Sequence, residues 1–152
     1  MRIRIPKTLR SMETTNIPVP TRIVVHQKSK VLEVEFDTGA CFNLPFELLR
    51  VYSPSAEVRG HGPGQETLQV GKKEVTINNL EPVGMYAVKP FFSDGHDSGL
   101  FSWQYLLWMG ENQEGLWEDY LERMKNAGAS REPNAPENIP FEQKKGGACA
   151  SH

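Results

Sequence analysis

The sequence predicts an α+β domain in which two small antiparallel β-sheets carry short helices, followed by a C-terminal helical segment. Three observations predict it: short runs that alternate apolar and polar residues, glycine turns between these runs, and a late apolar stripe at helical spacing. The length agrees, because 152 residues with 38% hydrophobic and 24% charged side chains is the composition of one globular domain.

The first half predicts a hairpin, a third strand and a short helix. Residues 21–27 and 31–37 flank a polar turn, and the second run alternates apolar with acidic side chains, which is typical of paired strands with one wet face. Gly39 then turns the chain into a strand at 41–44. Pro45 at a first helical position predicts a short helix over residues 46–50.

The second half predicts a similar order. Residues 67–70 and 73–78 flank Gly71-Lys72 and suggest a tight hairpin, and strands follow at 86–93 and 98–101. Helices then close the domain.

Ser102 is a natural N-cap for a helix that would end at Gly110, and a further helical stripe runs to Gly128. The stripe contains Trp103, Leu106, Leu107, Leu116, Trp117, Tyr120, Leu121 and Met124. Such a stripe favours a core-facing side.

An internal sequence similarity indicates that the two sheets share the same order of elements. The run FDTGACFNLPFELL, residues 36–49, resembles FSDGHDSGLFSWQYLL, residues 92–107, as strand, glycine turn, strand and helix. Two such copies would build two small antiparallel sheets rather than one doubly wound sheet.

The domain boundaries follow from proline and from apolar content. Two prolines close together end the segment 1–20, which we expect to be a flexible leader. Residues 129–152 contain three prolines and few large apolar side chains, which predicts a disordered tail. The folded domain is therefore expected at 21–128.

Composition excludes several classes of protein. A formal net charge of -2 disfavours nucleic acid as a partner, and the apolar runs are far too short for a membrane span. Two cysteines without an apparent signal peptide favour a reducing, cytoplasmic location. The oligomeric state is not predicted.

No catalytic motif is present. The four histidines form no His-x-Asp or His-x-Glu start of an iron triad, and there is no Gly-x-Ser-x-Gly elbow or phosphate loop. Polar residues instead gather near the loop 52–65, where Arg50, Arg59 and His61 suggest a site for an anion or a carboxylate. The alternative is that Glu57 pairs with Arg59 and only fixes the loop.

Three separated motifs carry a family resemblance: LPFELLRVYSPSAEVRGHGPGQ, NNLEPVGMYAVKPFFSDGHDSGLFSW, and LLWMG with LWEDYLERM. Together they resemble, over residues 21–127, the domain of unknown function named for its similarity to the N-terminal domain of gamma-butyrobetaine hydroxylase. In that hydroxylase the domain precedes a catalytic domain with iron and 2-oxoglutarate, and in plants it follows a P-loop iron-sulfur carrier. The resemblance implies a stand-alone, bacterial-type accessory module rather than a dioxygenase.

The resemblance also implies a degenerate zinc site. The hydroxylase domain binds zinc through three cysteines after its Leu-Arg pair and one histidine from a later turn. Here Ser53, Ser55 and Val58 take the cysteine positions, and His96 alone keeps its type. One imidazole cannot replace four zinc ligands, so we expect no resident metal and no cofactor, with hydrogen bonds among Ser53, Ser55 and His96 holding the loop.

Two functions stay open. The first is a non-enzymatic accessory module that binds a protein partner or a small anionic ligand through the 52–65 loop and the 94–99 turn. The second is an accessory protein of iron or iron-sulfur metabolism that binds metal transiently. The candidate binding residues are Arg50, Ser53, Ser55, Arg59, His61, Asp94 and His96, and no catalytic residue is proposed.

Overall fold

The computed structural model describes residues 2–4, 18–55, 58 and 68–140. The elements are β1 (Arg2–Arg4), β2 (Pro20–His26), β3 (Val31–Phe36), β4 (Cys41–Pro45), α2 (Phe46–Val51), β5 (Ile77–Val83), β6 (Ala87–Phe92), β7 (Phe101–Ser102), α4 (Trp103–Glu111), α5 (Gln113–Ala127) and the 3-10 helix η1 (Pro136–Asn138).

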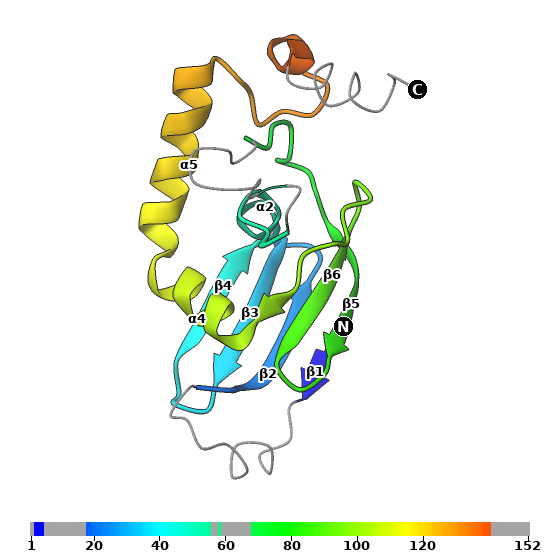
Figure 1. Cartoon of the computed structure of the whole chain (residues 1–152), viewed down its shortest axis with the longest axis vertical. Coiled ribbons are helices and arrows are strands. Elements are labelled where there is room, and N and C mark those ends of the chain that lie inside the picture. The colour runs from blue at the N-terminus through cyan, green and yellow to red at the C-terminus, as the bar shows by residue number, and fades with distance from the viewer. Residues whose placement is uncertain (1, 5–17, 56–57, 59–67, 141–152) are drawn as a thin grey trace.

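The strands form two antiparallel sheets, one in the order β1-β2-β3-β4 and one in the order β5-β6-β7. Figure 1 shows the sheets beside each other, with α4 and α5 along one side of the molecule and α2 at the end of β4. One apolar core joins both sheets to α2 and α4, and its fully buried members include Ile23, Val34, Leu44, Phe46, Val88, Phe101 and Leu106. The predicted α+β class is therefore confirmed.

The two glycine turns predicted by the internal similarity have the same backbone geometry. In the turn 36–40, the first amide donates to the fifth carbonyl at 2.8 Å, and the amide of Gly39 donates back to the first carbonyl at 3.0 Å. In the turn 92–96, the corresponding distances are both 3.0 Å, with Gly95 in the fourth place. The φ angles of the two glycines are +93° and +90°, a region that disfavours side chains with a Cβ. Each turn connects a sheet strand to the strand before a helix.

Two local predictions were wrong. No hairpin forms at 67–78 in the described residues, because β5 begins only at Ile77 and pairs with β6. Gly110 does not end α4, whose C-cap is Asn112. Gly110 instead allows α4 to lie close to β4, since a Cβ at Gly110 would lie 2.4 Å from Cγ of Phe42. Gly128 does cap α5, with a φ of +67°.

The expected boundaries also differ from the structure. The expected leader, 1–20, contains β1, which pairs with β2, and the buried Val19. The expected disordered tail, 129–152, does not begin at residue 129, because residues 129–140 form hydrogen bonds with the rest of the domain. Residues 141–152 lie outside the described part of the chain. The segment 129–140 is held by hydrogen bonds to residues far away in the sequence, which composition cannot predict. Figure 1 shows this segment beside the segment 68–76, beyond the end of α2.

Among the residues that the structure describes, no helix combines the length and the apolar character that crossing a membrane requires.

The close approach at Gly110 gives a test of the packing between α4 and β4. We expect Gly110→Ala to lower the free energy of unfolding by about 1–3 kcal/mol, because the added methyl group displaces the ring of Phe42. Gly115→Ala is the matched control, since nothing lies within 4 Å of its Cβ position, and it should gain up to about 1 kcal/mol of helix propensity. Urea unfolding curves measure both. Equal effects of the two substitutions would contradict the packing.

Candidate functional site

The candidate site begins with the burial of α2. All six residues of this short helix are buried, so the helix encloses charged side chains as well as apolar ones. The side chain of Arg50 is only 2% exposed. A buried guanidinium must find charged or hydrogen-bonding partners, and it finds them on the turn 92–96.

Asp94 is that partner. Its Oδ2 atom accepts a 2.8 Å hydrogen bond from Nε of Arg50 and a 2.6 Å hydrogen bond from Nζ of Lys72. Its Oδ1 atom accepts from the backbone amide of His96 at 3.2 Å, which shapes the turn. Two cations therefore share one carboxylate, which leaves this group of three side chains with a net positive charge.

The protonation of Asp94 reflects the same arrangement. Partial burial raises the pKa of Asp94, but the hydrogen bond from Lys72 and the charge of Arg50 outweigh it and hold this pKa well below its usual range. Asp94 is therefore a carboxylate at neutral pH.

Arg50 has a hydrogen-bond donor to spare. Its Nη1 atom is buried and has no hydrogen-bond partner in the described part of the chain. An unsatisfied buried donor is unfavourable, more so on a charged group, and an added oxygen acceptor would relieve the cost.

The serine and histidine residues form a second polar group beside the first. Nε2 of His96 lies 2.8 Å from Oγ of Ser53 and 3.4 Å from Oγ of Ser55. The close packing requires Gly99, because a Cβ there would lie 2.2 Å from Oγ of Ser53. The expected contacts among Ser53, Ser55 and His96 are thus present. Ser53 is 0% exposed, so its hydroxyl is enclosed in this structure.

These residues do not fit a zinc ion. The implied positions offer two hydroxyl groups, one isopropyl group and one imidazole, whereas structural zinc takes four thiolate or imidazole ligands. Val58 is buried, and its amide donates to the carbonyl of Ser55 at 3.1 Å. In the described ranges, no three His, Cys, Asp or Glu side chains gather where they could hold a metal ion.

The structure brings together five of the seven predicted residues: Arg50, Ser53, Ser55, Asp94 and His96. Arg59 and His61 lie outside the described residues, so their place is not defined. Lys72 is a member of the site that sequence reasoning missed, because Gly71-Lys72 was interpreted as a hairpin turn. The sequence offers no signal for Lys72 at the site, because residues 67–70 and 75–78 alternate apolar and polar side chains as paired strands do.

Tyr52 anchors the start of the 52–65 loop to the helices. Its hydroxyl donates to the carbonyl of Leu116 and contacts the carboxylate of Asp119, both at 2.9 Å, and its own carbonyl accepts from the hydroxyl of Tyr105 at 2.6 Å. Burial and the carboxylate of Asp119 raise the pKa of Tyr52 to about 12. Tyr52, which lies next to Ser53, is therefore held by both α4 and α5.

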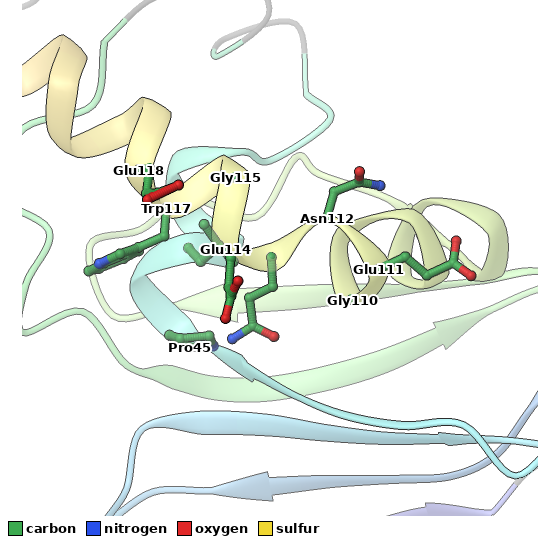
Figure 2. A pocket seen from close by; sticks show the side chains of 10 residues that line it. Pro45, Gly110, Glu111, Asn112, Glu114, Gly115, Trp117 and Glu118 are labelled. Carbon is green, nitrogen blue, oxygen red and sulfur yellow. The ribbon is translucent and has the colours of Figure 1, made fainter.

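A separate groove of about 1110 Å³ lies where α4 meets α5. Figure 2 shows Glu111, Glu114 and Glu118 around it, near Trp117 and Pro45. None of the five described candidate residues lines this groove, and its three carboxylates would repel an anion.

Comparison with known proteins agrees with this fold. The model of the family described as gamma-butyrobetaine hydroxylase-like, N-terminal matches residues 23–107. One NMR solution structure is 45% identical, with a TM-score of 0.69 over 79% of this chain and 94% of that chain. A second is 52% identical, with a TM-score of 0.68 over 80% and 91%.

A crystal structure of a protein of unknown function of the DUF971 family, from Acidithiobacillus ferrooxidans, is 39% identical over 57% of this chain and 86% of that chain, with a TM-score of 0.48. The search of the curated proteins gave no match.

The lowered pKa of Asp94 predicts acid sensitivity. Because the folded state holds this pKa below the ordinary 3.8, the carboxylate stabilises the fold fully above about pH 4, and the contribution is lost as pH falls toward the lowered pKa. Asp94→Asn should cost about 2–3 kcal/mol at pH 7, where it leaves Arg50 without its charged partner, and less at pH 3. Urea unfolding at both pH values measures this. The exposed Asp97→Asn is the control, and a cost of Asp94→Asn that does not change with pH would contradict the assignment.

The positions of Ser53, Ser55 and His96 predict that cysteine substitutions can create a zinc site here. A triple variant with cysteine in place of Ser53, Ser55 and Val58 should hold about one zinc ion per chain together with His96, because it supplies the three missing thiolates. Elemental analysis after dialysis measures the metal, and the thermal midpoint should fall on chelation. Adding His96→Ala to the triple variant should weaken binding. Stoichiometric zinc in the unchanged chain would contradict the claim that its ligands do not fit.

Proposed function

Because the chain belongs to the gamma-butyrobetaine hydroxylase-like N-terminal family, we propose that it is a non-catalytic accessory module that binds an oxyanion. The oxyanion is a carboxylate or phosphate group of a protein partner or of a small ligand. The binding surface is made by the 52–65 loop and the 94–99 turn. One observation carries the proposal: Nη1 of the buried guanidinium of Arg50 has no hydrogen-bond partner among the described residues, although Nε of the same side chain bonds to Asp94.

The charges and the donor geometry support this choice of ligand. Arg50 and Lys72 are both cationic and both pair with the carboxylate of Asp94, so a bound oxyanion would face two positive side chains. The planar fork of arginine suits carboxylate and phosphate oxygens, which can accept two parallel hydrogen bonds. The low exposure of Arg50 would strengthen such a contact, because water competes less there.

Two observations speak for an accessory role rather than an enzymatic one. The family match is to an N-terminal domain, not to a catalytic dioxygenase domain. The Ser53 and His96 pair resembles a nucleophile and its base, but the hydroxyl is enclosed. The free, exposed thiol of Cys41 suits the reducing cytoplasm that we propose as its location.

The test is an NMR titration with inorganic phosphate and with acetate at constant ionic strength. We expect the Nε–H resonance of Arg50 to shift with saturation in at least one titration. Lys72→Met should weaken the affinity about tenfold, because Asp94 then neutralises Arg50 alone. Lys73→Met is the matched control, since that neighbouring lysine pairs with Glu132 at the surface.

Two outcomes would contradict the proposal: no saturable shift at Arg50 with either anion, or equal binding by wild type and Lys72→Met. A parallel titration with ferrous or zinc ion tests the other candidate function. Saturable shifts confined to His96 and its neighbours would favour transient metal binding over the oxyanion.

A further inference from the structure

We infer that Arg131 and Asn138 are positioning residues for the charged group of Arg50, Lys72 and Asp94. Both belong to the segment 129–140, which we call the C-terminal strap. What the charged group binds rests on the proposed function, whereas its positioning by the strap rests on contacts alone.

The first contact of the strap is with α2, through Glu47. This carboxylate is buried one helical turn before Arg50, and it accepts two 2.8 Å hydrogen bonds from Nε and Nη2 of Arg131. The hydroxyl of Tyr120 donates a third, at 2.6 Å. The guanidinium of Arg131 also lies 5.0 Å from the ring centroid of Trp117, which fixes its plane.

The pairing of Glu47 with Arg131 determines whether Arg50 forms its ion pair with Asp94 or with Glu47. Residues three apart on a helix are neighbours, so an unpaired Glu47 would be a buried anion beside Arg50. Such an anion would attract the guanidinium away from Asp94. By neutralising Glu47, Arg131 keeps Arg50 directed to Asp94 and keeps its spare donor available.

The second contact of the strap is with the backbone on both sides of Lys72. The amide of Gly71 donates to the carbonyl of Ser130, and the amide of Lys73 donates to the carbonyl of Arg131, both at 2.9 Å. Two bonds that flank one residue fix its direction, and Nζ of Lys72 reaches Asp94 from this position. A Cβ at Gly71 would lie 3.3 Å from Nδ2 of Asn138, so the two segments touch.

Asn138 holds the strap in this shape. Its side chain is fully buried. Its Oδ1 accepts from the amide of Ser130 at 2.8 Å, and its Nδ2 donates to the carbonyls of Ser130 at 2.9 Å and Glu132 at 3.2 Å. Asn138 therefore fixes the backbone around Ser130 and Arg131, whose carbonyls accept the hydrogen bonds from the amides of Gly71 and Lys73.

In the described part of the chain, Arg131 and Asn138 form no hydrogen bond with Arg50 or Asp94. They act on the two cations through Glu47 and through the backbone around Lys72. This is why they are positioning residues and not binding residues.

The experiment compares Arg131→Ala and Asn138→Ala with the control Glu132→Gln, which removes only an exposed ion pair of the same strap. Two quantities are measured in each: the pKa of the Asp94 carboxyl by carbon NMR, and the affinity for inorganic phosphate from the Nε–H resonance of Arg50. Thermal midpoints and amide spectra report whether each variant stays folded.

We expect the pKa of Asp94 to rise toward its ordinary value in both alanine variants, because one of its two cations loosens in each. We expect phosphate to bind about fivefold more weakly, and both quantities to be unchanged in Glu132→Gln. Arg131→Lys should restore much of the Asp94 shift, since it keeps the charge on Glu47. Wild-type values in both alanine variants would overturn the inference.

The two proposals can fail separately. If the wild type binds no phosphate or acetate, the proposed function fails, whereas a raised pKa of Asp94 in the two variants still supports the positioning role. Arg131→Ala leaves a buried charge unpaired and could unfold the chain, so Asn138→Ala provides the second test. Complete unfolding of Asn138→Ala would also count against the inference, because the strap would then be part of the core.

Discussion

The burial of α2 is the constraint from which the arrangement of the site follows. This helix of six residues carries Glu47 and Arg50 into the interior, and neither charge can be buried without a partner. Each partner comes from a distant part of the chain: Arg131 from the C-terminal strap and Asp94 from the turn 92–96. Two opposite charges one turn apart on one helix therefore hold the second sheet and the strap against the first sheet.

The two glycine turns differ in what they contribute to the site, because only the second turn brings side chains to it. Both turns share one hydrogen-bonding pattern, and both lie before a helix. In the first turn, the third and fifth positions are Thr38 and Ala40, whereas in the second they are Asp94 and His96. The two turns thus share one backbone conformation, and only the second turn contributes polar side chains, Asp94 and His96, to the site.

What the sequence could predict divides by the range of the interactions. The hairpin of β2 and β3, the start of α2 and the Ser102 cap depend on neighbouring residues, and all three were predicted and confirmed. The contact of Arg131 with Glu47 spans 84 positions, and local composition carries no sign of it. The same applies to Lys72, whose position depends on strap carbonyls that propensity cannot place.

Among the site residues that are both predicted and described, Ser53, Ser55 and His96 came from a family pattern and Arg50 from the polar residues near the 52–65 loop. Neither source showed the charge balance of the site. The resemblance implies that hydroxyl groups stand here where a zinc-binding domain has thiolates, and such an exchange would change the charge balance. A zinc ion with three thiolates and one neutral imidazole carries one net negative charge, whereas two hydroxyls and an isopropyl group carry none. A zinc centre of that composition would therefore offset part of the positive charge of Arg50 and Lys72. Here Ser53 and Ser55 hold the loop to His96 without that offset. The hydroxyl groups of Ser53 and Ser55 thus supply no negative charge beside Arg50, and the proposed oxyanion would supply it at Nη1 of Arg50, which has no hydrogen-bond partner among the described residues.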